Sequence, residues 1–385
     1  MHFVTLSPLA LSLYVALRIL PPLRLPLAAK AGLALLLLLA AAKFCLYRLL
    51  GGSFFAPDLP RPCLLVMETL FTALLILALL QSVCDMAQMA LWGAGRCGLR
   101  VRLPAWGTRA ALAGILLAVA LPLGAWSVWQ AVRVPDVHAL RLSLPDVPKG
   151  LAGLRIVQIT DIHIRTLLDR EWLERVVAKV NALDPDVIAL TGDYVDGPVA
   201  MLKDALSPLA DLRARHGVYG VTGNHEYYYD AAAWAAQLRA FGVVLLCNEH
   251  RLLSLPGGRM AIAGIPDEME GRLGDGGPDV AAALRGVPRD APVLLLSHRP
   301  VQGGARAGVS LQLSGHTHGG MLFFLQPWVA LFNGGFVQGL YQDGAARLYV
   351  SPGPGLWGGF SCRLGVPSEI TLLSLQPGGA DSSNR

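Results

Sequence analysis

The chain contains, at residues 314–320, the stretch SGHTHGG, in which His316 and His318 stand between glycines at the end of an apolar run. Residues i and i+2 of an extended segment project to the same face, so both imidazoles can point to one place. Glycine lets the backbone turn sharply and approach other groups closely. The pattern indicates a metal site, although two polar histidines in an ordinary turn would give the same letters.

Four earlier runs that are typical of strands also end in polar groups. After 154–160 come Asp161 and His163, after 187–191 Asp193 and Asp196, after 218–222 Asn224, His225 and Glu226, and after 293–297 His298. Loops at the carboxyl ends of strands converge on one site in sheets of this kind. A single Asp after a strand is usually a helix cap. Asp, Asn or His at the ends of five strands instead predicts a shared site.

These residue types suit a particular chemistry. Asp, Asn and His supply the oxygen and nitrogen ligands that Zn, Mn or Fe prefer, and seven donors drawn from the residues named above exceed what one tetrahedral ion needs. Two ions about 3.5–4 Å apart would use them, and such a pair stabilises both the attacking and the leaving oxygen of an in-line phosphoryl displacement. Structural metal sites are usually closed and rich in cysteine. The pattern therefore favours a catalytic centre.

Composition and charge indicate membrane attachment. The 385 residues are 54% hydrophobic and 15% charged, whereas about a quarter of a soluble domain is charged. Residues 1–133 carry eleven Lys or Arg against three Asp or Glu, a net +8, and the remainder carries 21 against 24, a net −3. The basic residues flank apolar runs, which argues against nucleic-acid binding. The six cysteines include no Cys-x-x-Cys pair and predict neither a disulfide framework nor a zinc site.

Four apolar segments are candidate transmembrane helices, at 3–17, 31–47, 63–84 and 110–132. The first is short, and a signal peptide is its alternative, although it lacks a basic start and a convincing cleavage site. Four spans would put the loops near 18–30 and 93–109, with seven Lys or Arg, on one side. The positive-inside rule then places the residues after 133 outside the cytoplasm, in a multi-pass protein of the cell (inner) membrane. An error of one span would reverse this orientation.

Charged residues within these segments have ordinary explanations. We expect Lys43 to extend towards the membrane surface. Glu68 and Asp85 lie near span ends, where a structural role is favoured over a functional one.

The chain after residue 133 has the composition of a soluble α/β domain. A segment rich in Val, Pro and Asp at 134–152 is expected to be a linker, and a domain at 153–376 follows, with a disordered tail at 377–385. Nine strand-like runs recur, at 154–160, 187–191, 218–222, 243–246, 259–265, 293–297, 309–314, 346–350 and 369–375. Helical patterns lie at 170–183, 200–213 and 231–240. We expect two packed sheets with helices outside.

The order Asp-x-His, Gly-Asp-x-x-Asp, Gly-Asn-His-Glu, His and Gly-His-x-His resembles the calcineurin-like metallophosphoesterase superfamily over roughly residues 153–375. The apolar N-terminal third makes the chain similar to the membrane-associated branch, which includes transmembrane proteins with a metallophosphoesterase domain and YkuE- and YaeI-like phosphoesterases. The resemblance implies an α+β fold: a four-helix transmembrane anchor at 1–133 and a four-layer α/β/β/α double β-sandwich.

The resemblance also implies a ligand set. For a first divalent ion the ligands are Asp161, His163 and His318, for a second Asn224, His298 and His316, and for the bridge between them Asp193. His225 would stabilise the phosphoryl oxygens or protonate the leaving group, and a hydroxide bridging the two ions (Mn, Zn or Fe) would be the nucleophile.

Other polar residues near the motifs have weaker assignments. Asp196 is expected to be a structural acceptor, and Glu226 to cap or orient its loop. Arg165 could contact substrate phosphate or be a solvated loop arginine. The sequence departs from the branch after Gly320, where Met321 replaces the usual Gln.

The apolar stretch 321–332 beside the site could form a lipid-facing lip or pack in the core. A lip would favour an amphiphilic phosphoester or pyrophosphate, such as the UDP-2,3-diacylglucosamine-type precursor of lipid A that relatives in the superfamily cleave. That substrate is cytoplasmic, which conflicts with the orientation above. We expect a membrane-anchored metal-dependent hydrolase of a phosphomonoester, phosphodiester or pyrophosphate. The alternative is a sensor or scaffold that binds ligands in the same fold without turnover.

Overall fold

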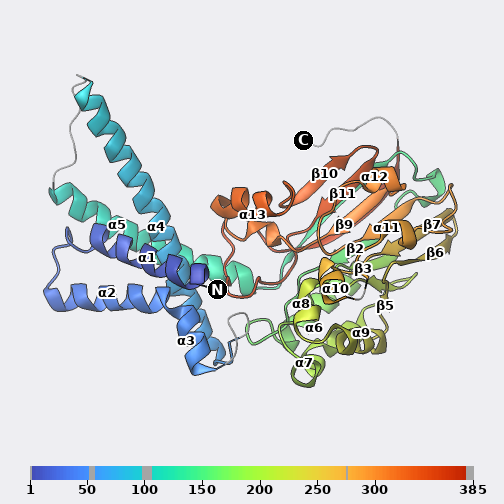
Figure 1. Cartoon of the computed structure of the whole chain (residues 1–385), viewed down its shortest axis with the longest axis horizontal. Helices are drawn as coiled ribbons and strands as arrows, with labels where there is room; N and C mark the ends of the chain where they lie inside the picture. Colours follow the sequence, from blue (N-terminus) through green and yellow to red (C-terminus); the bar gives the residue numbers. More distant parts are fainter. Residues whose placement is uncertain (1, 52–56, 98–105, 275, 379–385) are drawn as a thin grey trace. The chain divides into compact units, whose positions relative to one another are not determined.

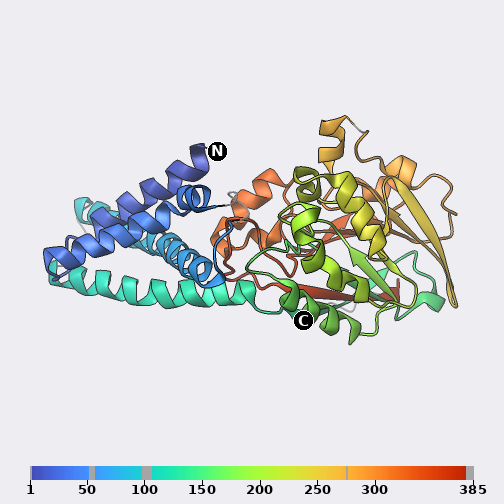
Figure 2. The same cartoon turned by 90° about the horizontal axis from the view of Figure 1, so that it is seen from below.

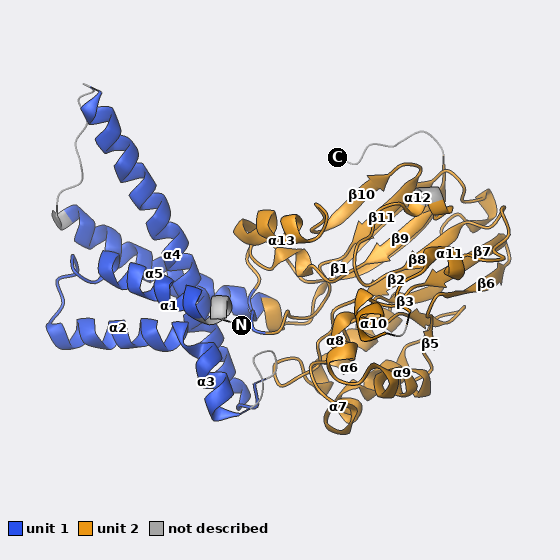
Figure 3. Ribbon diagram, viewed as in Figure 1, with its two compact units in different colours: residues 1–130, 359–362 blue, residues 131–358, 363–385 orange. Residues whose placement is uncertain are grey.

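The computed structural model describes residues 2–51, 57–97, 106–274 and 276–378 (Figure 1). The chain divides into two compact units, one of residues 1–130 and 359–362, the other of residues 131–358 and 363–385 (Figure 3). Of the tail expected at 377–385, residues 379–385 lie outside the described part, and Pro377 ends the last strand.

The described part of the first unit is helical. It contains α1 (His2–Ile19), α2 (Leu27–Ala41), α3 (Lys43–Leu50), α4 (Arg61–Arg96) and α5 (Trp106–Val132). Helices α1, α2 and α4 pack on one another. At Gly124 of α5, an added Cβ would lie 3.0 Å from the backbone oxygen of Thr69 on α4. A small residue here lets the two helix backbones approach closely, as in membrane helix pairs.

Two of these helices, α4 and α5, are long and apolar enough to cross a membrane, and α2 with α3 would supply a third span if that pair, bent by 68°, counts as one. The apolar part of α1, Leu6–Ile19, is shorter. The four-span anchor is therefore not confirmed by the described residues, and the orientation derived from four spans stays a prediction. Helix α4 exceeds the expected span at 63–84 because good helix formers follow Asp85 and the next glycine is Gly93.

The expectation that Lys43 reaches the membrane surface was wrong. Its side chain is fully buried, and Nζ lies 2.8 Å from Oε2 of Glu68, which compensates the charge within the unit. Asp85 accepts hydrogen bonds from Nε of Arg18 (2.9 Å) and the hydroxyl of Tyr14 (2.8 Å). Glu68 and Asp85 are thus both paired, in keeping with the structural role expected for them.

The described part of the second unit contains two six-stranded sheets. Their strand orders are β1-β12-β2-β3-β4-β5 and β10-β11-β9-β8-β7-β6. The strands are β1 (Asp136–Leu144), β2 (Arg155–Ile159), β3 (Val187–Leu190), β4 (Val218–Gly220), β5 (Val244–Leu245), β6 (Glu249–Leu255), β7 (Gly258–Gly264), β8 (Val293–Leu296), β9 (Leu311–Ser314), β10 (Gly339–Asp343), β11 (Ala346–Val350) and β12 (Glu369–Pro377).

Helices and 3-10 turns connect these strands. They are η1 (Lys149–Leu151), α6 (Arg170–Asn181), α7 (Val199–Leu206), η2 (Ser207–Asp211), α8 (Asn224–Tyr228), α9 (Ala231–Ala240), α10 (Glu268–Leu273), α11 (Val280–Ala283), α12 (Gly304–Ala307), η3 (His318–Gly320), η4 (Phe323–Leu325) and α13 (Gln326–Phe332). Figures 1 and 2 together place α6, α7 and α9 on one side of the first sheet.

The alternation of side chains along the strands builds the core. Leu294 and Leu296 of β8 lie in one cluster with Ile156 of β2, so the two sheets share a hydrophobic core. Val293 and Leu295 point to the other face, where Ala283 of α11 covers them. The structure thus confirms a mixed α/β fold with two sheets.

Three strands were missed in the sequence, and one of them, β1, falls within the expected linker at 134–152. Prolines at 135, 145 and 148 favoured the linker interpretation. Leu140, Leu142 and Leu144 nevertheless alternate with polar residues at the period of a strand, and β1 pairs in parallel with β12 along all nine residues.

The sheet topology explains why polar strand ends meet. Strands β2, β3 and β4 are parallel neighbours in the first sheet, and β7, β8, β9 and β11 are parallel neighbours in the second. The carboxyl ends of each set therefore lie along one edge of its sheet.

Candidate metal centre

The structure brings together the residues that the sequence placed at strand ends. Asp161 and His163 follow β2, Asp193 follows β3, Asn224 and His225 begin α8 just after β4, His298 follows β8, and His316 and His318 follow β9. All are buried except His316, which is half-buried.

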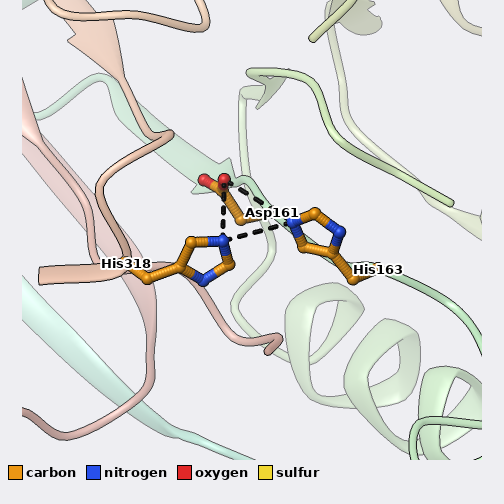
Figure 4. Close-up of side chains that lie close together, drawn as sticks. All are labelled: Asp161, His163 and His318. Atoms are coloured by element: carbon orange, nitrogen blue, oxygen red, sulfur yellow. Dashed lines mark hydrogen bonds and ion pairs between the residues drawn. The ribbon is translucent and has the colours of Figure 1, made fainter. Parts of the chain in front are cut away.

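A first group consists of Asp161, His163 and His318, which face one another (Figure 4). Nε2 of His318 lies 3.2 Å from Nε2 of His163 and 3.4 Å from Oδ1 of Asp161. A tetrahedral ion with metal–nitrogen bonds of about 2.0–2.1 Å has ligand atoms about 3.3–3.4 Å apart. The third distance, between Nε2 of His163 and Oδ1 of Asp161, is 3.9 Å. Two of the three spacings thus match those around one metal ion, and the group is a candidate site for one.

A second group is built around His298. Its Nε2 lies 3.2 Å from each of three atoms: Oδ2 of Asp193, Oδ1 of Asn224 and Nδ1 of His316. Its other ring nitrogen, Nδ1, is 2.8 Å from the carbonyl oxygen of Thr191. A hydrogen bond from Nδ1–H to this carbonyl leaves the Nε2 lone pair facing the group.

Asp193 connects the two groups. Its Oδ2 is 3.6 Å from Nε2 of His163 in the first group and 3.2 Å from Nε2 of His298 in the second. The other oxygen, Oδ1, accepts the backbone N–H of His225 at 2.8 Å, which fixes the carboxylate. Asp193 therefore lies between donor atoms of both groups.

The glycines of the motifs make room for these carboxylates. A Cβ at Gly315 would lie 2.1 Å from Oδ2 of Asp161, and one at Gly223 would lie 2.2 Å from Oδ1 of Asp193. Without a side chain at 315, the backbone N–H of His316 comes close enough to donate to both oxygens of Asp161, at 2.9 and 3.1 Å.

The backbone itself is strained at the site. Five of the clustered residues adopt left-handed backbone conformations, which non-glycine residues rarely do: Asp161 (φ 53°), His163 (48°), Asp193 (54°), His316 (71°) and His318 (48°). Such strain concentrates at functional sites, where the surrounding structure holds it in place.

Asp196 lies behind two of the histidines. Its Oδ1 is 3.0 Å from Nδ1 of His163 and 2.5 Å from Nδ1 of His225, so Nε2 of each ring is directed towards the centre. Asp196 thus has the position of the structural acceptor expected for it. Glu226 accepts backbone N–H groups of Asp193, Tyr194 and Gly223 and orients the loops, also as expected.

The electrostatics of the site favour positive charge. Burial alone would lower the pKa of His225, but Asp193 and Asp196 raise it to about 9. Burial is likewise outweighed at His298, whose pKa Asp193 raises to about 10. Burial, together with the neighbouring charges of His298 and His163 respectively, holds the pKa values of His316 and His318 well below the usual value. A neutral imidazole has the lone pair that a metal ion requires.

The two arginines near the site differ in position. Nη1 of Arg165 donates to Sδ of Met201 on α7, so its assignment to substrate stays a prediction. Arg299, which sequence reasoning missed, has Nη1 3.1 Å from Nε2 of His316 and donates through Nε to Asp267 at 2.8 Å. The available signal was its place directly after His298 at a strand end.

The apolar stretch at residues 321–332, which follows His316 and His318, has a buried part and an exposed part. Met321 and Leu322 are buried, whereas η4 and α13 present large exposed side chains: Phe323 (51% exposed), Trp328 (64%), Leu331 (70%) and Phe332 (79%). Gln326 donates to the carbonyl oxygen of Gly319 at 3.1 Å and so ties α13 to the loop that carries His318.

Comparison with known proteins identifies the family of the chain. Residues 154–320 match the family model described as calcineurin-like phosphoesterase. A transmembrane protein with metallophosphoesterase domain from Bos taurus is 35% identical over 319 residues, which cover 79% of this chain and 70% of that protein. The protein of the same name from Danio rerio is 36% identical over 274 residues, covering 68% and 62%.

A bacterial relative is similar over less of this chain. The uncharacterized metallophosphoesterase YkuE of Bacillus subtilis is 33% identical over 248 residues, which cover 62% of this chain and 84% of YkuE. The chain spans about two thirds of the length of the two animal relatives.

Proposed function

Because this chain belongs to the calcineurin-like phosphoesterase family, we propose that it is a membrane-anchored, metal-dependent hydrolase of a phosphomonoester, phosphodiester or pyrophosphate bond. The observation that carries the proposal is the position of Asp193 between two groups of nitrogen and oxygen donors. Two divalent ions (Mn, Zn or Fe) held there would polarise the phosphoryl group and activate water for an in-line attack.

The ligand assignment follows the two groups. The first ion would be held by Asp161, His163 and His318, the second by Asn224, His298 and His316, and both by Asp193. Donor spacings near 3.2–3.4 Å in each group support this assignment.

His225 is the residue we assign to proton transfer. Asp196 engages its Nδ1, so Nε2 faces the centre, 3.9 Å from Oδ2 of Asp193. Despite burial, Asp193 and Asp196 raise the pKa of His225, and the protonated ring could give its proton to the leaving oxygen or stabilise the phosphoryl oxygens. His225 is also close enough to His163 and Asp193 to be a metal ligand. The two roles differ in whether its loss lowers metal content.

Arg299 is placed to bind the phosphoryl group. Its guanidinium lies beside His316 and Asn224 of the second group, with Nη2 3.4 Å from Oδ1 of Asn224, and its side chain is 24% exposed. A planar guanidinium suits two phosphate oxygens at once.

The exposed side chains of η4 and α13 support an amphiphilic substrate. Phe323, Trp328, Leu331 and Phe332 follow the loop of His318 in the chain and are exposed. The same chain contains helices that are long and apolar enough to cross a membrane. A lipid-linked phosphoester would place its tail against this surface and its phosphate at the metal centre. A UDP-2,3-diacylglucosamine-type lipid A precursor is one such compound to test.

The experiment is a substrate screen of the full-length protein loaded with Mn, Zn or Fe. Phospholipids, lipid-linked pyrophosphates, nucleotides, phosphoproteins and a chromogenic phosphodiester form its arms. We expect hydrolysis that stops after chelation, returns with added metal and is lost in Asp193→Ala. Activity that survives chelation or this substitution would contradict the proposal. Ligand binding without turnover in every arm would favour the sensor or scaffold instead.

A further inference from the structure

The helical first unit contains a short piece of C-terminal chain, Gly359–Cys362. A buried ion pair holds it. Nζ of Lys43 donates to the carbonyl oxygen of Gly359 at 2.7 Å and to Oε2 of Glu68 at 2.8 Å. The same Oε2 of Glu68 accepts the backbone N–H of Ser361 at 3.2 Å. Each partner of the ion pair therefore contacts the segment directly.

Aromatic rings enclose this ion pair. Nζ of Lys43 lies 3.8 Å from the ring centroid of Phe71, and Phe71 packs edge-on against Phe360 of the segment at 5.7 Å. The hydroxyl of Tyr47 donates to the other oxygen of Glu68, Oε1, at 2.6 Å. Lys43 is 0% and Glu68 2% exposed.

Two buried charges in an apolar helical unit are costly unless their hydrogen bonds are complete. Helix-to-helix contacts alone would leave Lys43 and Glu68 each with fewer partners. The carbonyl of Gly359 and the N–H of Ser361 supply further ones. Lys43 and Glu68 therefore bind the segment Gly359–Cys362 in addition to pairing with each other.

The next residue along the chain, Arg363, belongs to the second unit and lies within its metal-binding end. Its buried guanidinium donates to the carbonyl oxygens of Pro352 (2.7 Å), Gly353 (3.1 Å) and Gly355 (2.8 Å), and to that of His318 (3.3 Å). The backbone at Gly355 in turn lies against Asp161, since a Cβ there would be 2.1 Å from the carbonyl oxygen of Asp161.

We propose that Lys43 and Glu68 form a clamp that fixes Gly359–Cys362 and thereby sets the position of Arg363, which braces His318 and Asp161. Lys43 and Glu68 are positioning residues in this scheme. The link to the metal centre rests on the function proposed above, whereas the clamp itself does not.

Cys362 is a natural reporter, because it is fully buried within the clamped segment. The background is the full-length protein in lipid bilayers with the other five cysteines replaced by Ser. The test variant is Lys43→Met with Glu68→Met, which removes both charges and leaves neither one buried alone. We expect Cys362 to react with a maleimide at least about tenfold faster. The matched control, Arg18→Gln with Asp85→Asn, breaks a different ion pair of the same unit and should leave the rate unchanged.

The second readout is Mn²⁺ affinity, measured by equilibrium dialysis so that it does not depend on turnover. Loss of an outer partner of a metal ligand lowers affinity about 10–100-fold, and we expect a loss of at least about tenfold in the Lys43→Met/Glu68→Met variant. For a soluble phosphodiester, kcat should fall while KM stays the same. Phe360→Ala keeps the ion pair but removes the ring packed on Phe71. It should also raise the maleimide rate and lower the Mn²⁺ affinity, and it replaces the double variant if that protein fails to fold.

The outcomes separate the two proposals. An unchanged maleimide rate in both variants overturns the clamp. A faster rate with unchanged Mn²⁺ affinity overturns its link to His318. Absence of turnover in the wild-type background, with Mn²⁺ binding and labelling as expected, contradicts the hydrolase and leaves the clamp supported.

Discussion

Gly315→Ala tests whether a metal centre can be lost while every ligand side chain is kept. The new methyl group would lie 2.1 Å from Oδ2 of Asp161 and 2.1 Å from Oγ1 of Thr160, where ordinary contact begins near 3.4 Å. One of the groups must therefore move by about 1.3 Å. Both neighbouring residues are buried, and the backbone N–H of His316 holds Asp161 from the same side, so the movement has little room.

Metal coordination tolerates distance errors of only about 0.2 Å, so a carboxylate displaced by about 1.3 Å ceases to be a ligand. Displacement of an outer partner costs about 10–100-fold in affinity, and displacement of a ligand itself should cost at least about 100-fold. Overpacking should also lower the free energy of unfolding by about 1–3 kcal/mol.

Metal content by mass spectrometry and thermal unfolding with and without Mn²⁺ measure these effects. Gly304→Ala is the matched control, because a Cβ there meets its nearest neighbour at 3.4 Å. If Gly315→Ala binds as much metal as the wild-type protein, with both sites equally occupied, the assignment of Asp161 as a ligand is refuted.

Three further predictions concern the acid, the surface and the topology. His225→Asn should lower kcat by about 10²–10⁴-fold, the usual contribution of a general acid, with metal content unchanged; lower metal content would instead identify His225 as a ligand. Leu331→Ser with Phe332→Ser should raise KM for a vesicle-embedded phosphoester at least about tenfold and leave a soluble phosphodiester unaffected, whereas equal changes for both substrates would contradict a lipid-facing role; their exposure predicts little change in stability. Reporter fusions after residue 133 and within residues 93–109 should report opposite sides of the membrane, with the former outside the cytoplasm; the same side for both would contradict the span count, and the reverse orientation would contradict the assignment from the positive-inside rule.

The metal-binding part of the fold could be predicted because its signals are local. Each ligand follows a short apolar run, and the parallel topology of β2, β3 and β4 brings the ends of those runs together. Gly315 and Gly223 likewise stand beside the ligands in sequence and in space. A motif read along the chain therefore contained most of the site.

The remaining features depend on contacts between distant residues. Lys43 donates a hydrogen bond to Gly359, which lies 316 residues further along the chain. In the sequence, a lysine in an apolar segment looks the same whether it is buried or extends to the membrane surface. Strand β1 is recognised by its partner β12, which lies more than 200 residues further along the chain. Arg299 differs from an ordinary loop arginine only through its neighbours Asp267 and His316. Single-sequence patterns carry no information about such partners.

The carboxylate of Asp196 has a consequence for how this protein can change in evolution. One oxygen atom serves the ring of His163 and the ring of His225, the first assigned to cation binding and the second to proton delivery. The two properties are therefore not independent traits. A substitution at Asp196 that changes the pKa of His225 would also change cation binding at His163. Selection on either property would therefore act on the other through this single oxygen atom.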